Sequence, residues 1–264
     1  MKKQVRFIAV SLVLLLTATL MSGCNKNPSG DGDTSSMLRP GFPDFVGDGV
    51  YEGFEYDQFQ SYISITKYTG DDKDVVVPET IDDLPVTTLG DRTFFNSDNE
   101  NRINTVSLPS TLTTIDKQTF YSSLYLESIE VADGNETFIS EDGVVYTKDK
   151  TEIWGFPENK KDTEFTVPEG VTDIQNSQFA FLKNVEIINL PSTVEIISDF
   201  AFHGSTKLKE IVIPEGTTTI GACAFFSCTS LERAVIPASV TSIAANAFTG
   251  CEKLTVIEGY AGTE

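Results

Sequence analysis

The sequence has 264 residues, with 19 Lys and Arg against 39 Asp and Glu, for a formal net charge of −20. Its 40% apolar residues can bury a sizeable core, so the composition excludes a disordered chain. The charge repels phosphate backbones and anionic headgroups, which argues against nucleic-acid binding and leaves neutral, cationic or apolar partners. One histidine and four cysteines are too few for a His-rich metal centre or a disulfide scaffold.

The N-terminus is organised like an export signal. Lys2, Lys3 and Arg6 precede a mainly apolar stretch, residues 7–20. This stretch is shorter than the ~20 residues that a membrane-spanning helix needs. A charged segment followed by a short apolar one and small residues is typical of a secretory signal. The pattern predicts that residues 1–23 are a removable signal peptide.

The end of this segment, Leu20-Met21-Ser22-Gly23-Cys24, resembles the lipobox of bacterial lipoproteins, with Met21 where those proteins usually have Leu. The resemblance implies that Cys24 is diacylated and becomes the new N-terminus. The alternative is an ordinary signal with an incidental cysteine. Two acyl chains anchor a protein stably. We therefore expect an exported protein, lipid-anchored to the bacterial cell membrane or cell surface, whose only membrane contact is the anchor at Cys24.

Residues 24–47 are expected to be a flexible tether. The stretch from Asn25 to Ser36 contains no apolar residue and is rich in flexible or solvating ones. Asp31 and Asp33 suggest a calcium loop. However, Ser36 stands where such a loop needs Gly, and Phe42 stands where it needs Glu. We therefore interpret the segment as a solvated linker.

Six repeat units make up the rest of the chain. Four phenylalanines recur with a period of 23 residues, as do the prolines eleven residues before them: Phe179, Phe202, Phe225 and Phe248, with Pro168, Pro191, Pro214 and Pro237. Each unit also repeats an Ile, an Ala or similar residue before the Phe, and a Leu or Val. Phe94 and Phe120 mark two further units, with three residues inserted between them and 36 inserted before Phe179.

A period of 23 residues is typical of leucine-rich repeats. The segment 208–213 alternates as a strand does, and Pro214 after it ends the hydrogen-bonded ladder. Each coil has an apolar face that only a neighbour can cover, so the coils stack at ~4.8 Å and their strands form a parallel sheet. The pattern predicts an α/β leucine-rich-repeat solenoid, mostly β. We expect about six coils with a concave parallel sheet and short helical turns or strands on the far side.

The repeat Pro-x-x-Val-x-x-Ile-x-x-x-Ala-Phe-x-x-Cys-x-x-Leu-x-x-Ile-x-Ile resembles that of BspA-like leucine-rich repeat proteins of bacterial surfaces, over about residues 51–262. Residues 65–70 and 84–91 are similar to the family's N-terminal lead-in, and residues 141–149 to a recurring hairpin insertion. We place the solenoid at 48–264, the lead-in at about 48–83 and the insertion at 132–167. Such arrays often continue after Gly262 into a capping helix, so either the cap is missing or the sequence is truncated.

The resemblance implies a binding or adhesion surface on the cell exterior, with no catalytic residues to carry over. His203 is the only histidine, and residues of any type fill its turn position in the other units. No spacing supplies further metal ligands, and we find no catalytic motif. The acidic residues alone are no evidence for a glycosidase. We therefore predict no enzyme activity, no metal and no cofactor.

The cysteines of adjacent coils occupy one column. Cys228 and Cys251 are 23 residues apart, and Ser205 and Ser123 fill the same column earlier. Small buried side chains suit a tight inner turn, so we expect free, packed thiols. A disulfide between stacked coils is the alternative, because their Cα spacing permits one. Cys223 is expected to be unpaired in either case.

Trp154 lies in the insertion, near Tyr146 and Phe156. Aromatic rings on a projecting hairpin can stack on a sugar, so Trp154 and Tyr146 define an alternative function, a carbohydrate-binding surface module. We favour the interpretation that Trp154 pins the hairpin to the coil beneath it.

The main functional prediction is a surface-anchored interaction protein, monomeric, that binds an extracellular protein or glycan through its concave sheet. Two columns of strand residues face that side: Thr105, Ser128, Ile187, Glu210, Arg233 and Val256, then Ser107, Glu130, Asn189, Val212, Val235 and Glu258. Ile187, Val212, Val235 and Val256 form an apolar cluster there, which suggests a contact patch. The preference of β-branched residues for strands explains the cluster equally well. The candidate ligand-binding residues are Ile187, Glu210, Val212, Arg233, Val235, Val256 and Trp154.

Overall fold

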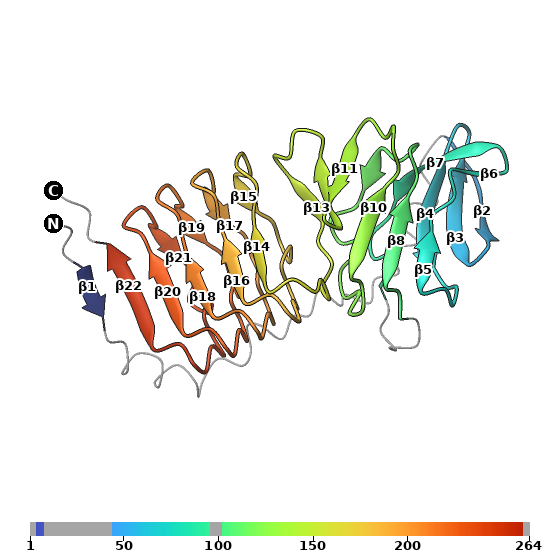
Figure 1. The fold of residues 1–264 in the computed structure, drawn as a ribbon. Coiled ribbons are helices and arrows are strands. Elements are labelled where there is room, and N and C mark those ends of the chain that lie inside the picture. The colour runs from blue at the N-terminus through green and yellow to red at the C-terminus, as the bar shows by residue number, and fades with distance from the viewer. Residues whose placement is uncertain (1–3, 8–43, 96–101, 261–264) are drawn as a thin grey trace. The chain divides into compact units, whose positions relative to one another are not determined.

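The computed structural model describes residues 4–7, 44–95 and 102–260. These residues form strands and turns without a helix, in a mostly-β solenoid of about eight turns (Figure 1). The predicted leucine-rich-repeat fold is confirmed. The described residues fall into two compact units. The C-terminal unit contains residues 4–7, 150–152 and 160–260, and the N-terminal unit contains 44–95, 102–149 and 153–159.

A parallel sheet is the main element of the C-terminal unit. It contains β14 (Glu164–Thr166), β16 (Ile187–Asn189), β18 (Glu210–Val212), β20 (Arg233–Ile236) and β22 (Val256–Tyr260). The register advances by 23 residues per coil, as in the pair of Glu210 with Arg233. β1 (Gln4–Phe7) adds an antiparallel strand to β22. The rest of the predicted signal peptide and most of the tether, including Cys24, lie outside the described residues.

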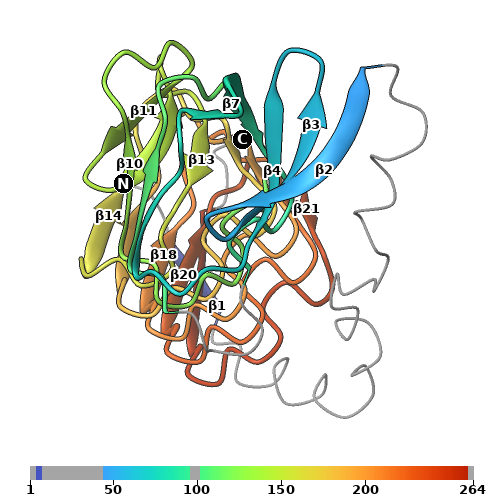
Figure 2. The same cartoon turned by 90° about the vertical axis from the view of Figure 1, so that its right-hand side faces the viewer.

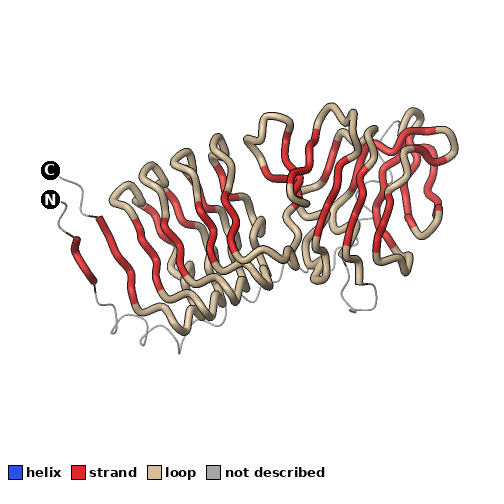
Figure 3. The backbone as a smooth tube through the Cα atoms, in the orientation of Figure 1, coloured by secondary structure: helices blue, strands red, loops and turns tan. Residues whose placement is uncertain are grey.

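Each coil of this unit also contributes to a second, narrower ladder. Its two-residue strands are β15 (Asp173–Ile174), β17 (Ile196–Ile197), β19 (Thr219–Ile220) and β21 (Ser242–Ile243). Short strands and turns alternate along each coil (Figure 3). The Ala-Phe pair lies in the turn after each short strand, so the phenylalanine belongs to neither a helix nor a strand.

Stacked phenylalanine rings form the core of this unit. Phe179, Phe202 and Phe225 are fully buried. The rings of Phe202 and Phe225 are nearly parallel, with their centroids 4.9 Å apart, and the rings of Phe225 and Phe248 are stacked at the same distance. Backbone hydrogen bonds join the turns, such as Phe202 N–H to the Ala224 carbonyl at 2.7 Å. The 23-residue period thus brings identical residues into contact.

Buried hydroxyls and thiols donate hydrogen bonds to backbone carbonyls of the same turns. Ser205 Oγ donates to the Phe179 carbonyl at 2.6 Å. Cys228 Sγ and Cys251 Sγ donate likewise to the Phe202 and Phe225 carbonyls, each at 3.1 Å. Both thiols are free and buried, as predicted. Burial raises the pKa of Cys251 to about 12 and raises that of Cys228 as well, so neither thiol is a nucleophile at neutral pH.

The N-terminal unit combines coils with antiparallel pairs. Figure 2 shows β2 (Phe45–Tyr51), β3 (Phe54–Phe59) and β4 (Ile63–Tyr68), which pair in an antiparallel order. β4 then pairs in parallel with β7 (Leu84–Leu89). β7 also pairs with β6 (Thr80–Ile81), in antiparallel order, and with β9 (Thr114–Ile115), in parallel. A second, parallel sheet contains β5 (Asp74–Val76), β8 (Thr105–Leu108) and β10 (Ser128–Val131). The lead-in segment therefore contributes coils of its own, which is why the turns outnumber the six repeats.

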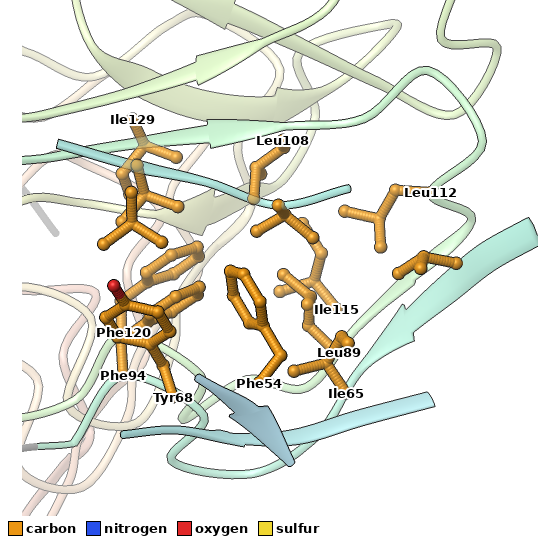
Figure 4. Packing of buried hydrophobic residues seen from close by; sticks show 14 of the residues in the cluster. Phe54, Ile65, Tyr68, Leu89, Phe94, Leu108, Leu112, Ile115, Phe120 and Ile129 are labelled. Atoms are coloured by element: carbon orange, nitrogen blue, oxygen red, sulfur yellow. The ribbon is translucent and has the colours of Figure 1, made fainter. Parts of the chain in front are cut away.

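An antiparallel sheet follows these coils. It contains β11 (Phe138–Glu141), β12 (Val144–Thr147) and β13 (Ile153–Gly155). The unit's core includes the stacked rings of Phe94 and Phe120, whose centroids are 5.5 Å apart, and Phe54, Ile65 and Leu89 belong to the same cluster (Figure 4). Trp154 packs against this core and is partly buried.

Candidate interaction surface

The outward face of the C-terminal sheet holds most of the predicted site. Side chains alternate along a strand, so each strand presents two residues outward. The first column is Glu164, Ile187, Glu210, Arg233 and Val256, and the second is Thr166, Asn189, Val212, Val235 and Glu258. We call these ten positions the outward face. Thr105, Ser128, Ser107 and Glu130, which were expected to extend the columns, lie on β8 and β10 of the N-terminal unit.

Two apolar side chains of the outward face are exposed to solvent. Ile187 is 43% exposed and Val212 is 49% exposed. Val256 is half-buried. Val235 is only 1% exposed, so the prediction that it belongs to an open apolar cluster is wrong. An ion pair joins β20 and β22 on the same face.

Arg233 is the cation of that ion pair and connects two carboxylates. Its Nη2 lies 2.8 Å from Glu258 Oε2, and its Nε donates to Glu258 Oε1 at 3.4 Å. Its Nη1 donates to Glu210 on the other neighbouring strand. The hydrogen bonds from Glu258 and the two negative charges raise the pKa of Arg233, while desolvation opposes them. Glu210 and Arg233, both predicted site residues, thus form one network with Glu258.

Glu164 is a carboxylate of the outward face that the sequence analysis missed. Asn189 Nδ2 donates to Glu164 Oε1 at 2.8 Å and to Thr166 Oγ1 at 3.2 Å. Glu164 is paired in register with Ile187, which in turn is paired with Glu210. The 36-residue insertion hides this position, but Glu164 stands 23 residues before Ile187, and that spacing could have identified it.

The aromatic residues of the insertion are packed rather than displayed. The Trp154 ring meets Phe138 edge-on at 6.0 Å, and Lys117 Nζ lies 5.8 Å from its centroid. Trp154 Nε1 is buried without a hydrogen-bond partner. Tyr146 is only 4% exposed, and its burial, with Glu141 and Asp142 nearby, raises the pKa of its hydroxyl. The alternative that Tyr146 stacks on a bound sugar is therefore contradicted, and the packing of Trp154 supports the pinning interpretation.

His203 lies among aromatic rings. Its ring centroid is 5.0 Å from that of Phe181, 5.7 Å from Phe200 and 5.2 Å from Phe226. Burial lowers its pKa. Within the described parts of the chain, no group of three or more His, Cys, Asp or Glu residues converges as a metal site would require.

Cys223 differs from its prediction. It is disulfide-bonded, whereas the sequence predicts an unpaired thiol. Asn246 holds the Cys223 region from the next coil, with its Oδ1 accepting from Cys223 N–H at 3.3 Å. No helix long and apolar enough to cross a membrane occurs in the described ranges.

Comparisons with known proteins agree with this architecture. A family model described as the BspA type leucine-rich repeat region matches residues 73–144 and 154–261, in six copies. Among curated proteins, none matches the chain.

Solved structures supply further similarities. A leucine-rich repeat protein from Eubacterium ventriosum is 20% identical, with a TM-score of 0.56 over 81% of this chain and 84% of that one. The pneumococcal vaccine antigen PcpA is 20% identical, with a TM-score of 0.51 over 72% of this chain and 59% of that one. A leucine rich cell surface protein from Faecalibacterium prausnitzii is 18% identical, with a TM-score of 0.46 over 82% and 96%. The first two similarities show a shared fold.

Proposed function

Because the chain belongs to the BspA-type leucine-rich repeat family, we propose that it is a surface-displayed module that binds another protein through the outward face. The observation that carries this proposal is the exposure of Ile187 and Val212 on a sheet whose other described apolar residues are buried or half-buried. Exposed apolar side chains rimmed by charged ones are typical of contact surfaces, and solenoids use their sheets for binding.

The proposal includes an anchor. The lipobox-like end of the export segment supports a lipid on Cys24, and the apolar-free stretch after it would hold the domain away from the headgroups. The protein would then face the cell exterior, where its partner is another protein. Binding by a monomer through this face is sufficient, and no catalytic step is involved.

A matched pair of substitutions tests the face. Ile187→Asn removes an exposed isoleucine from the outward face, and Ile196→Asn removes one of similar exposure, 40%, from the second ladder. We expect the purified protein, probed on an array of extracellular proteins and glycans, to lose its protein ligands through Ile187→Asn and to keep them with Ile196→Asn. Melting temperatures serve as the folding control. Equal effects of both changes, or glycan binding that only Trp154→Ala removes, would contradict the proposal.

A further inference from the structure

We infer that the outward face binds a cationic segment of its partner, in which two Lys or Arg side chains flank an apolar one. This inference rests on the proposed function and adds the partner's chemistry. It follows from the placement of charges around Ile187, which lies in register between Glu164 and Glu210 on the two neighbouring strands. Parallel strands are ~4.8 Å apart, so the two carboxylate-bearing positions are separated by about 10 Å.

The negative charge of the outward face is only partly neutralised. On the three strands around Ile187, which are β14, β16 and β18, the outward face has two carboxylates, Glu164 and Glu210, and no cation; Arg233 on β20 binds Glu210 and Glu258. Glu164 receives its hydrogen bond from the neutral amide of Asn189, and no cation of the described residues pairs with it. The amide orients the carboxylate without cancelling its charge. A cationic partner would therefore gain from this face, while an anionic one would be repelled.

The apolar residues suit the same kind of partner. Lys and Arg carry long apolar stems below their charged ends. A stem lying on Ile187 or Val212 would place its charge beside Glu164 or Glu210 and cover apolar surface as well. The overall charge of −20 would further speed the approach of such a segment. The apolar and the acidic residues of the outward face thus both favour a ligand with Lys or Arg side chains.

Three soluble nine-residue peptides of Gly and Ser provide the probes. The first has two lysines four positions apart with a leucine midway between them, so that all three side chains point to the same side when the peptide is extended. The second replaces the lysines by glutamates, and the third replaces the leucine by serine. We expect NMR titration of the full chain to show binding of the first peptide at least tenfold tighter than of the second. Raising the salt from 50 to 500 mM should weaken it, because the charges are exposed. Equal or tighter binding of the glutamate peptide would overturn the inference.

Glu164→Gln tests the carboxylate itself. The glutamine oxygen can still accept from Asn189, so the fold should be unaffected. An exposed ion pair contributes little, and we expect a two- to fivefold weaker binding of the lysine peptide. Glu195→Gln makes the same charge change on the exposed residue before β17 and should have no effect.

The two proposals fail differently. If Ile187→Asn weakens the binding of natural partners but Glu164→Gln leaves the lysine peptide unchanged, the outward face is the contact surface and its cationic specificity is wrong. If neither change affects any ligand, the outward face itself is excluded, and both proposals fail.

Discussion

Each coil of the C-terminal unit turns through one left-handed residue after its core phenylalanine. This column contains Phe181, Gly204, Ser227 and Gly250, with φ between +57° and +79°. Left-handed backbone costs a residue with a Cβ about 1 kcal/mol or more, and glycine avoids this cost. Phe181 adopts the left-handed conformation despite this cost, and its ring contacts His203 and lies over Gly204.

We predict that Gly204→Ala destabilises the protein. Its φ is +68°, and an added Cβ would lie 2.7 Å from Cδ1 of Phe181. The strain and the displaced ring should together lower the free energy of unfolding by about 1–3 kcal/mol. Gly47→Ala is the control, because nothing lies within 4 Å of its added Cβ, and its effect should stay within about 0.5 kcal/mol. Urea denaturation measures both, and equal stabilities would show that the turn is not constrained.

At the scale of the element, one coil depends on the coils beside it. The Phe225 ring stacks on Phe202 and Phe248, and Cys251 donates to its carbonyl. Neighbouring turns also exchange backbone hydrogen bonds. A repeat protein is stabilised mainly by such nearest-neighbour contacts, so damage to one coil should reach the next.

We predict that Phe225→Ala lowers the free energy of unfolding by about 3–5 kcal/mol, because it leaves a cavity between two rings. Hydrogen exchange should increase in both flanking coils, at β18 and β22. Phe226→Ala removes a half-buried ring next to it and should cost clearly less. Exchange confined to a single coil would argue against the stacking described for these turns.

At the scale of the whole molecule, the anchor decides where the binding face is displayed. We predict that Cys24→Ala abolishes lipid attachment and releases the protein into the medium or leaves it unprocessed. Metabolic labelling with a fatty acid and detergent partitioning measure this. Processing after Gly23 with unchanged partitioning would count against a lipid on Cys24.

The fold, the parallel register and the stacked phenylalanines follow from the repeat, because a constant period of 23 residues puts the same residue types in contact at every coil. The packed thiols of Cys228 and Cys251 repeat with the same period and were predicted from it. The exposure of the outward residues, in contrast, depends on tertiary contacts. Val235 is buried, Glu164 joins the outward face although the insertion hides its place in the repeat, Tyr146 is enclosed and Cys223 is disulfide-bonded. These properties depend on side chains that do not repeat, and a period carries no information about them.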